Sequence, residues 1–416
     1  MKHMDTTESS RLFESVRVGN MMLAHRVGMS PLTRLRASDD HVPLDMVTEY
    51  YSQRASTPGT LLISEGVFIS EVDGGIPNVP GIYNEQQICA WKQVTDAVHR
   101  QGSYIFCQLW VPGRAAIVRF AESEGMSIYS SSATPLHAGH KPPRALTVKE
   151  IQQKIKSHVT AAENAIAAGF DGIEIHGANG YLMDQFTQDC CNQRTDRYGG
   201  SIQNRSRFTV EVTAAISKAI GPQRVGIRLS PWNTYNAMKM DNPVLQFSDL
   251  VSQLSGLGIA YLHLIEARIA GIEDAESPPA PSETLAFAYG LWKGPLLVGG
   301  GFTPETARRL VDVEYPDRDI VVTFGRRFLS TPDLPFRIRK HIPLGEYDRS
   351  TFYGPQTAAG YIDYSFCDEF VAERRRRPRQ QRQWPRQRQR QRQRQLHHQQ
   401  NEKPGIDSAG VISCME

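Results

Sequence analysis

The run EIHGANGYL brings three side chains with useful chemistry, His176, Asn179 and Tyr181, into one short segment. The first two can donate hydrogen bonds to a carbonyl oxygen, and the phenol can deliver a proton nearby. The pattern therefore predicts a site that holds a carbonyl oxygen and supplies a proton. The alternative is a histidine whose bonds are satisfied at the end of a strand, followed by an ordinary loop.

Two glycine-rich segments stand near the end of the globular part of the chain. Gly299, Gly300 and Gly301 form a GGG run, and Gly325 and Arg326 belong to FGRR. Glycines let backbone amides approach an anion, and an arginine beside them adds charge-assisted hydrogen bonds. We expect the two segments to bind a phosphate. The alternative is that GGG is only a flexible turn.

Two polar residues fall where the pattern predicts the interior of the protein, Gln108 in FCQLW and Arg228 in VGIRLSP. Each alone could be a polar group whose bonds are satisfied in the core. Combined with a phosphate site, an inward glutamine and an inward arginine suggest a bound anionic heterocycle.

A repeat of short apolar runs and helical stretches must position these groups. The runs are nearly continuous, which is typical of parallel strands covered by helices. Eight such units predict an α/β fold, a single (β/α)8 TIM barrel with an N-terminal β cap, whose chemistry belongs at the carboxyl ends of the strands. No GxGxxG follows a strand, so a doubly wound sheet is disfavoured. The expected strands are His25–Pro31, Thr60–Gly66, Ser103–Trp110, Phe170–His176, Arg224–Ser230, Ile259–Ile265, Pro295–Gly299 and Asp319–Phe324.

Helix boundaries can be predicted as well. Thr147 and Glu150 fit a capping box, and Gly169 suits the stop of the same helix. Two long stretches, Val111–Arg144 and Glu266–Trp292, interrupt the repeat, and we expect them on the substrate-binding face of the barrel. Further helices are expected at Gln86–Arg100, Ser201–Ile220, Phe247–Leu257, Pro304–Val313 and Pro332–Lys340.

Charge divides the 416-residue chain into two parts. Residues 374–416 hold 12 basic and 3 acidic side chains, whereas the other 373 residues hold 35 and 41. We therefore expect an acidic domain at 11–373 and a disordered, low-complexity Arg/Gln-rich tail at 374–416. The acidic domain is not expected to bind nucleic acid. The alternative is a tail that binds RNA or DNA by releasing counterions.

Composition excludes several other classes of protein. With 40% hydrophobic and 22% charged residues, the chain has the profile of a soluble globular enzyme, and its apolar runs are too short to span a membrane. The first ten residues, MKHMDTTESS, contain no apolar signal segment, so we expect a cytoplasmic protein. The six cysteines show no CxxC spacing, so we expect neither a metal site nor an iron–sulfur cluster.

The strand-end motifs also carry a family resemblance. The chain resembles the Old Yellow Enzyme family of FMN-dependent ene-reductases, in its fungal branch, from about Leu12 to about Val371. Several features are also similar to the chanoclavine-aldehyde reductase group of alkaloid biosynthesis. WNTYNAMKM and the loop from Arg268 to Phe287 match the family poorly. The matching segments are SPLTRLRA, EYYSQRAS, GTLLISEG, FCQLW, GFDGIEIHGANGYLMDQFTQDCCNQRTDRYGGSIQNRSRF, VGIRLSP, FGRRFLSTPDLPFR and YDRSTFY.

The resemblance implies a role for each matching residue. Thr33 would hydrogen-bond the flavin, Pro31 and Gly66 would line its ring system, Gln108 would bond its pyrimidine edge, and Arg228 would stabilise its anionic reduced form. The ribityl phosphate would be bound by Gly300, Gly301, Gly325 and Arg326.

The substrate would meet a second set of residues. His176 and Asn179 would bind its carbonyl oxygen, Tyr181 would be the proton donor, and Trp110 and Tyr353 would shape the pocket.

The implied reaction is the NADPH-dependent reduction of the C=C bond of an α,β-unsaturated aldehyde or ketone, with ping-pong hydride transfer through flavin N5. It would serve fungal secondary metabolism or enone detoxification. The alternative within the same barrel is a flavin isomerase or dehydrogenase acting on a biosynthetic intermediate. The partner is expected to be this small molecule, and the protein a monomer or homodimer.

Overall fold

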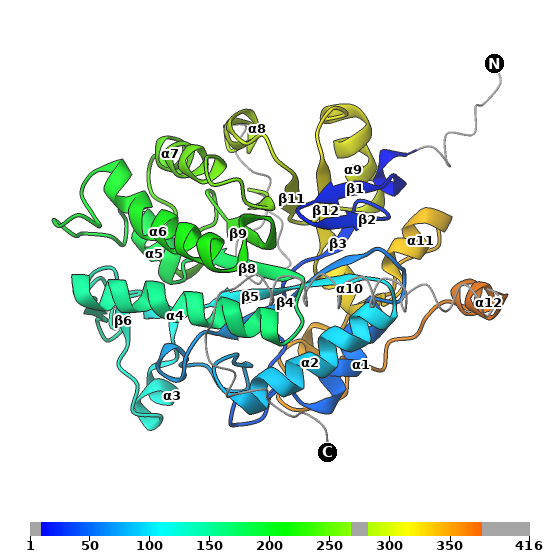
Figure 1. The fold of residues 1–416 in the computed structure, drawn as a ribbon, viewed down its shortest axis with the longest axis horizontal. Coiled ribbons are helices and arrows are strands. Elements are labelled where there is room, and N and C mark those ends of the chain that lie inside the picture. The colour runs from blue at the N-terminus through cyan, green and yellow to red at the C-terminus, as the bar shows by residue number, and fades with distance from the viewer. Residues whose placement is uncertain (1–9, 268–281, 377–416) are drawn as a thin grey trace, which may run out of the picture.

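A closed, all-parallel barrel forms the centre of the computed structural model, which describes residues 10–267 and 282–376 (Figure 1). Within these residues the strands follow one another around the barrel in sequence order, and β10 pairs with both β9 and β11. The expected TIM barrel is confirmed. Its strands are β3 (Val27–Met29), β4 (Leu61–Phe68), β5 (Tyr104–Trp110), β8 (Gly172–Gly177), β9 (Val225–Leu229), β10 (Tyr261–Ile265), β11 (Leu296–Gly299) and β12 (Ile320–Phe324).

An antiparallel hairpin of β1 (Val16–Val18) and β2 (Met21–Leu23) covers the amino-terminal end of the barrel. Its buried side chains belong to one apolar cluster with residues at the starts of the barrel strands, among them Leu61, Phe106 and Leu297. Burial of this apolar surface closes the end opposite the carboxyl ends of the strands. The predicted N-terminal cap is therefore confirmed.

Helices surround the barrel, and α4 and α6 lie against each other on one flank (Figure 1). The expected helices are present with small shifts at their ends, except that the stretch from Pro304 becomes a short α-helix followed by a π-helical turn at Leu310–Glu314. The helices that follow the strands are α1 (Asp45–Arg54), α2 (Glu85–Arg100), α4 (Val148–Ala167), α5 (Leu182–Thr187), α6 (Ile202–Ile220), α7 (Pro243–Ser255), α8 (Ala286–Leu291), α9 (Pro304–Arg309), α10 (Arg326–Ser330), α11 (Leu334–Lys340) and α12 (Asp368–Arg376).

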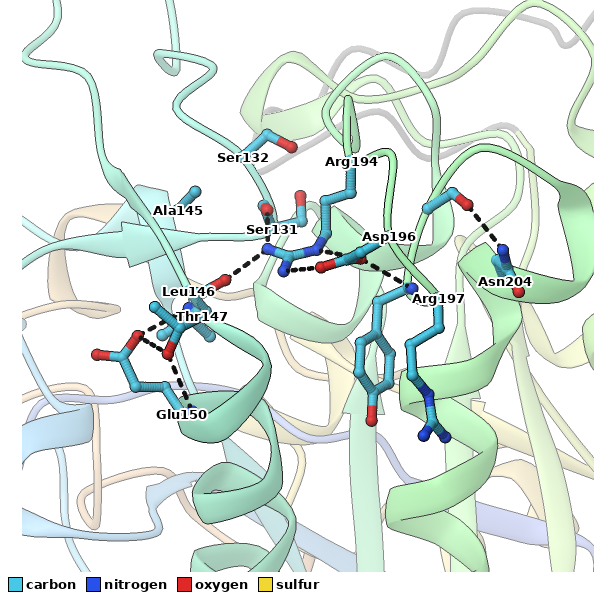
Figure 2. A network of polar contacts seen from close by, with 12 residues as sticks. Ser131, Ser132, Ala145, Leu146, Thr147, Glu150, Arg194, Asp196, Arg197 and Asn204 are labelled. Atoms are coloured by element: carbon cyan, nitrogen blue, oxygen red, sulfur yellow. Dashed lines mark hydrogen bonds and ion pairs between the residues drawn. The ribbon is translucent and has the colours of Figure 1, made fainter.

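Helix α4 begins with the predicted capping box (Figure 2). The Thr147 backbone N–H donates to Glu150 Oε2 over 2.8 Å, and the Glu150 N–H donates to Thr147 Oγ1 over 3.3 Å. The helix stops where expected, at Gly169, whose φ of +89° is unfavourable for other residues. Local sequence thus determines both ends of this helix.

The insertion after β5 contains α3 (Val118–Ser123) and a small parallel sheet of β6 (Tyr129–Ser130) and β7 (Arg144–Ala145). Arg194, from the segment between α5 and α6, fixes this sheet by donating to the carbonyl oxygens of Ser131 and Leu146 over 2.8 and 2.6 Å (Figure 2). Asp196 holds the same guanidinium through two further hydrogen bonds. The insertion is therefore attached to the loop region that follows β8.

Three buried arginines attach the C-terminal segment to the start of the barrel. Arg34 donates to the carbonyl oxygens of Phe352 and Gly360 over 3.0 and 2.8 Å, and Arg36 donates to Thr357 O over 3.0 Å. Stacked rings fill the space between them, with Tyr50 and Tyr361 centroids 4.1 Å apart. This arginine–tyrosine cluster, defined by Arg34, Arg36, Arg54, Tyr50 and Tyr361, positions the segment that carries Tyr353.

Arg374, Arg375 and Arg376 form the last turn of α12, and the domain boundary expected at residue 374 stays a prediction. Residues 377–416, and with them most of the Arg/Gln tail, lie outside the described residues, as do residues 268–281 of the second insertion. The disorder of the tail and its possible affinity for nucleic acid stay predictions.

Replacing Arg54 should destabilise the protein. Arg54 donates to the carbonyl oxygens of Tyr361, Tyr50 and Leu329, so Arg54→Met would leave buried acceptors without a donor. We expect a loss of about 2–5 kcal/mol in the free energy of unfolding. The measurement is the midpoint of urea unfolding.

Arg309→Met is the matched control, because the Arg309 side chain is 72% exposed and pairs with Glu314 at the surface. Such pairs contribute about 0–1 kcal/mol. An Arg54→Met midpoint equal to that of the control would contradict the anchoring role.

Candidate active site

A cavity of about 600 Å³ opens at the carboxyl ends of the barrel strands. Its volume falls within the range typical of small-molecule sites, roughly 300–1,000 Å³. With the single exception of Gly66, every site residue expected from the sequence lines it. These lining residues are Pro31, Thr33, Gln108, Trp110, His176, Asn179, Tyr181, Arg228, Gly300, Gly301, Gly325, Arg326 and Tyr353.

The glycine-rich strand ends meet at one end of this cavity. Gly300 and Gly301 have φ angles of +131° and +67°, a backbone conformation that suits glycine. Gly299 is equally constrained, because a Cβ there would lie 2.6 Å from Thr323 Oγ1. Gly325 and Arg326 follow the neighbouring strand, β12, which is paired with β11. The glycines and Arg326 thus follow two paired strands and line the same cavity, and the phosphate site stays a prediction.

The floor of the cavity rests on a buried carboxylate, Glu174. Gln108 Nε2 donates to Glu174 Oε1 over 2.7 Å, and Tyr261 Oη donates to Oε2 over 3.1 Å. His263 Nδ1 is 2.8 Å from the same Oε2, and its Nε2 is 3.2 Å from Thr323 Oγ1. The network explains why polar residues are tolerated inside the barrel, since each is bonded to another.

Arg228 differs from these neighbours, because its buried Nε has no hydrogen-bond partner among the described residues. Burial lowers the pKa of the guanidinium, and nearby Glu174 works in the opposite direction. A buried donor without an acceptor is costly unless a ligand supplies one. Together with the glycine cradle, this orphaned donor fits a ligand that has a polar heterocycle at one end and a phosphate at the other.

His176 presents a defined hydrogen-bond donor to the cavity. Burial, with the charge of Arg228 and then His263 adding to it, lowers the pKa of His176 well below its usual range. The ring is therefore neutral near pH 7. The Ala178 backbone N–H donates to His176 Nδ1 over 3.4 Å, so Nδ1 is an acceptor and the proton is on Nε2.

Asn179 and Tyr181 lie on the same wall. Asn179 has a φ of +59°, which asparagine tolerates better than most residues. The Tyr181 ring meets the rings of Trp110 and His176 edge to face, at 4.8 and 4.9 Å between centroids. Burial raises the pKa of Tyr181, and a side-chain hydrogen bond with Asn236 partly offsets the rise. The phenol is thus protonated at neutral pH and can act as a proton donor.

Gly66 does not line the cavity, although it was expected to line the ring system of the flavin. It lies behind Trp110, and a Cβ at this position would come within 2.5 Å of Trp110 Cε3. Its small size allows the indole to pack against the strand. Tyr353, by contrast, is 46% exposed at the rim, where the C-terminal segment passes over the cavity.

Sequence reasoning missed several lining residues, including Asn233, Tyr235, Phe302 and Thr323. Asn233 and Tyr235 belong to WNTYNAMKM, a segment that resembles the family poorly, so no motif identified them. Thr323 was assigned to a strand, and its inward direction could not be derived without the register.

Groups of His, Cys, Asp or Glu able to hold a metal ion are absent from residues 10–267 and 282–376. Among the same residues no helix is long and apolar enough to cross a membrane. Cys107, Cys190, Cys191 and Cys367 carry free thiols.

The fold and the site define a TIM-barrel oxidoreductase that uses a phosphorylated heterocyclic cofactor. Residues 11–345 match the NADH:flavin oxidoreductase / NADH oxidase family, and the chain belongs to it. It is therefore an FMN-dependent oxidoreductase. The Old Yellow Enzyme from Pichia sp. AKU4542 superimposes with a TM-score of 0.80 at 36% identity, covering 87% of this chain and 95% of that one.

Similar proteins include three fungal relatives. Chanoclavine-I aldehyde reductase fgaOx3 of Penicillium roqueforti is 53% identical, over 87% of this chain and 98% of the relative. NADP-dependent oxidoreductase lnbE of Aspergillus flavus is 51% identical over the same shares. The "probable inactive dehydrogenase" easA of Claviceps purpurea is 48% identical over 87% of this chain and 97% of the relative.

His176 should show no titration around pH 6.5, because burial and the charge of Arg228 lower its pKa well below the usual value. NMR of protein labelled at the histidine rings, assigned with His176→Gln, should show an Nε2–H tautomer without titration. A histidine-containing model peptide in the same buffer is the control, with its midpoint near 6.5. A midpoint near 6.5 for His176 would contradict the assignment.

Proposed function

We propose that this protein reduces the activated C=C bond of an α,β-unsaturated aldehyde or ketone with NADPH. One observation carries the proposal: the N–H donors of His176 and Asn179 and the protonated phenol of Tyr181 share one wall of the cavity. The names of two relatives, an aldehyde reductase and an NADP-dependent oxidoreductase, support the substrate class and the reductant.

The residues available to hold FMN divide between the two ends of the cavity. Gly300, Gly301, Gly325 and Arg326 would hold the phosphate, with backbone amides and one guanidinium as donors. Arg228, whose Nε needs an acceptor, would hold the polar edge of the ring system. Gln108 would add its Oε1, since its Nε2 donates to Glu174.

Pro31 and Thr33 would contact the flavin from the end of β3. When bound, FMN would supply the hydride-transfer chemistry that links the reduced nicotinamide to the substrate. Gly66 would act indirectly, by giving Trp110 room to shape the pocket together with Tyr353.

His176 and Asn179 would bind the carbonyl oxygen of the substrate. Negative charge grows on this oxygen as hydride reaches the β-carbon, and N–H donors already aimed at it stabilise that charge without reorganising. The neutral state of His176 suits this task. The neutral imidazole donates a hydrogen bond from Nε2 but does not readily give up that proton.

Tyr181 would then protonate the α-carbon. A phenol of raised pKa stays protonated until a strongly basic carbon develops beside it, so proton transfer follows the growth of charge. The presence of this proton donor favours net reduction over isomerisation, because isomerisation needs no such delivery to complete a turnover.

Tyr181→Phe should separate the two halves of the reaction. Reduction of 2-cyclohexen-1-one should slow by about 100-fold or more, because the α-carbon loses its proton donor. Oxidation of NADPH, which needs no proton from Tyr181, should change little. Stopped-flow absorbance of the flavin measures both steps.

Tyr315→Phe is the control for that comparison, since Tyr315 packs against Tyr289 away from the cavity. If Tyr181→Phe slowed neither step, the proton-donor role would be refuted. A wild-type protein that oxidises NADPH yet reduces no enone or enal would refute the proposed substrate class.

Arg326→Ala should weaken FMN retention by about tenfold or more, because a charge-assisted bond to the phosphate is lost. The ratio of flavin to protein after dialysis measures this, with Arg309→Ala as an exposed control. Full occupancy in Arg326→Ala would show that the phosphate is held elsewhere.

A further inference from the structure

The loop after β9 packs directly on the segment that carries the substrate-binding residues. Gly180, between Asn179 and Tyr181, has a φ of +73°, and a Cβ there would lie 2.6 Å from both Asn236 Cβ and Met238 Cγ. The two segments are thus in van der Waals contact with no room for a side chain. The geometry of Asn179 and Tyr181 therefore depends on the positions of Asn236 and Met238.

Asn233 is the member of this loop whose hydrogen bonds have a fixed direction. It is 5% exposed, and its Oδ1 accepts the Tyr235 backbone N–H over 2.8 Å. A backbone N–H can only donate, so the bonded side-chain atom must be the oxygen. The other amide atom, Nδ2, is then the donor, and it reaches Asn179 Oδ1 over 2.7 Å.

This bond determines which end of the Asn179 amide meets the cavity. Its Oδ1 is occupied by Asn233, and its Nδ2 makes no hydrogen bond to a described side chain or backbone group although the residue lines the cavity. The direction set by the Tyr235 backbone is thus transmitted through two amides. An N–H group, not a carbonyl oxygen, is left to meet a ligand.

The backbone of Asn179 is held as firmly as its side chain. Its N–H donates to Ser230 Oγ over 2.8 Å, and its carbonyl oxygen accepts from Asn236 Nδ2 over 2.9 Å. These two bonds stabilise its φ of +59°. All the contacts come from β9 or the loop after it, so one structural unit holds Asn179 from three sides.

Arg114 in turn holds the loop. The buried guanidinium donates to the carbonyl oxygens of Asn236 and Ala237 over 3.1 and 3.2 Å, at two residues with φ angles of +57° and +55°. Those two bonds come from Nη2, and the second terminal nitrogen, Nη1, donates to Thr134 O and Pro135 O. The loop is therefore braced against the insertion after β5 and is not free to move away from Asn179.

We infer that Asn233 is a positioning residue, which orients the Asn179 amide so that its N–H group faces the substrate oxygen. The inference rests on the proposed function. On this inference, Asn233 makes the site specific for ligands with an acceptor oxygen, such as a carbonyl or a phenolate. Asn233 lies outside the segments that match the family.

Two substitutions of similar size separate orientation from simple packing. Asn233→Asp keeps the shape and the acceptor for Tyr235 but replaces the donor with a second acceptor, so Asn179 should turn its Nδ2 toward Asp and its oxygen toward the substrate. Asn233→Leu removes the donor without reversing it. We therefore expect Asn233→Asp to be the more damaging change.

The assay uses the FMN-bound enzyme with 4-chlorophenol as its phenolate and 2-cyclohexen-1-one. Asn233→Asp should raise the phenolate Kd and lower kcat/KM for the enone by about 100-fold, the size of effect seen when one oxyanion donor is lost. Asn233→Leu should change the phenolate Kd and kcat/KM by smaller factors. The FMN content of both variants should match wild type. Thr234→Ala, an exposed neighbour without a side-chain cap bond, should behave as wild type.

If Asn233→Leu lost more than Asn233→Asp, the side chain would act by packing, and the inference would be overturned. Wild-type phenolate affinity in Asn233→Asp would overturn it as well. If wild type reduced no enone, the proposed function would fail, while the phenolate affinities would still decide the orientation of Asn179.

Discussion

The buried carboxylate of Glu174 is the interaction on which the floor of the cavity depends. A carboxylate removed from water is costly unless hydrogen bonds or opposite charge compensate it. Here Gln108, Tyr261 and His263 surround it, and they come from β5 and β10 on either side of the barrel interior. The same carboxylate raises the pKa of Arg228 and so opposes the lowering that burial causes. Gln108 and Arg228, which line the cavity, are therefore ordered by a carboxylate that is not itself among the lining residues.

The cavity wall that carries His176 and Asn179 is also ordered by hydrogen bonds, here to backbone groups and not to a carboxylate. The Ala178 N–H makes His176 a donor at Nε2, and the Tyr235 N–H makes Asn179 a donor through Asn233. A backbone amide cannot reverse its direction as a side-chain amide can. The wall is thus preorganised for negative charge on a ligand, which is the form of stabilisation that contributes most to catalysis.

Much of this arrangement could be predicted from the sequence, for reasons that differ from residue to residue. The barrel strands were recognisable because both faces are buried, and Thr147 with Glu150 marked a helix start by local chemistry alone. His176 and Arg228 were found because each ends a strand. Gly66, expected beside the flavin, is not among the residues lining the cavity, and its contact with Trp110 could not be predicted because it depends on how β4 and β5 pair. Asn233 was missed because its role comes from contact with a loop 54 residues away.

The arginine–tyrosine cluster has a consequence for how the chain is made. Arg34, Arg36 and Arg54 emerge early in synthesis, but most of the carbonyl groups that they bind belong to residues 351–361. β3 must likewise wait for β12 to complete the sheet. Until then the nascent chain carries an open sheet edge and three arginines without their C-terminal acceptors, a state prone to aggregation. A ribosome that stalls between β11 and the C-terminal segment would leave this protein in need of a chaperone.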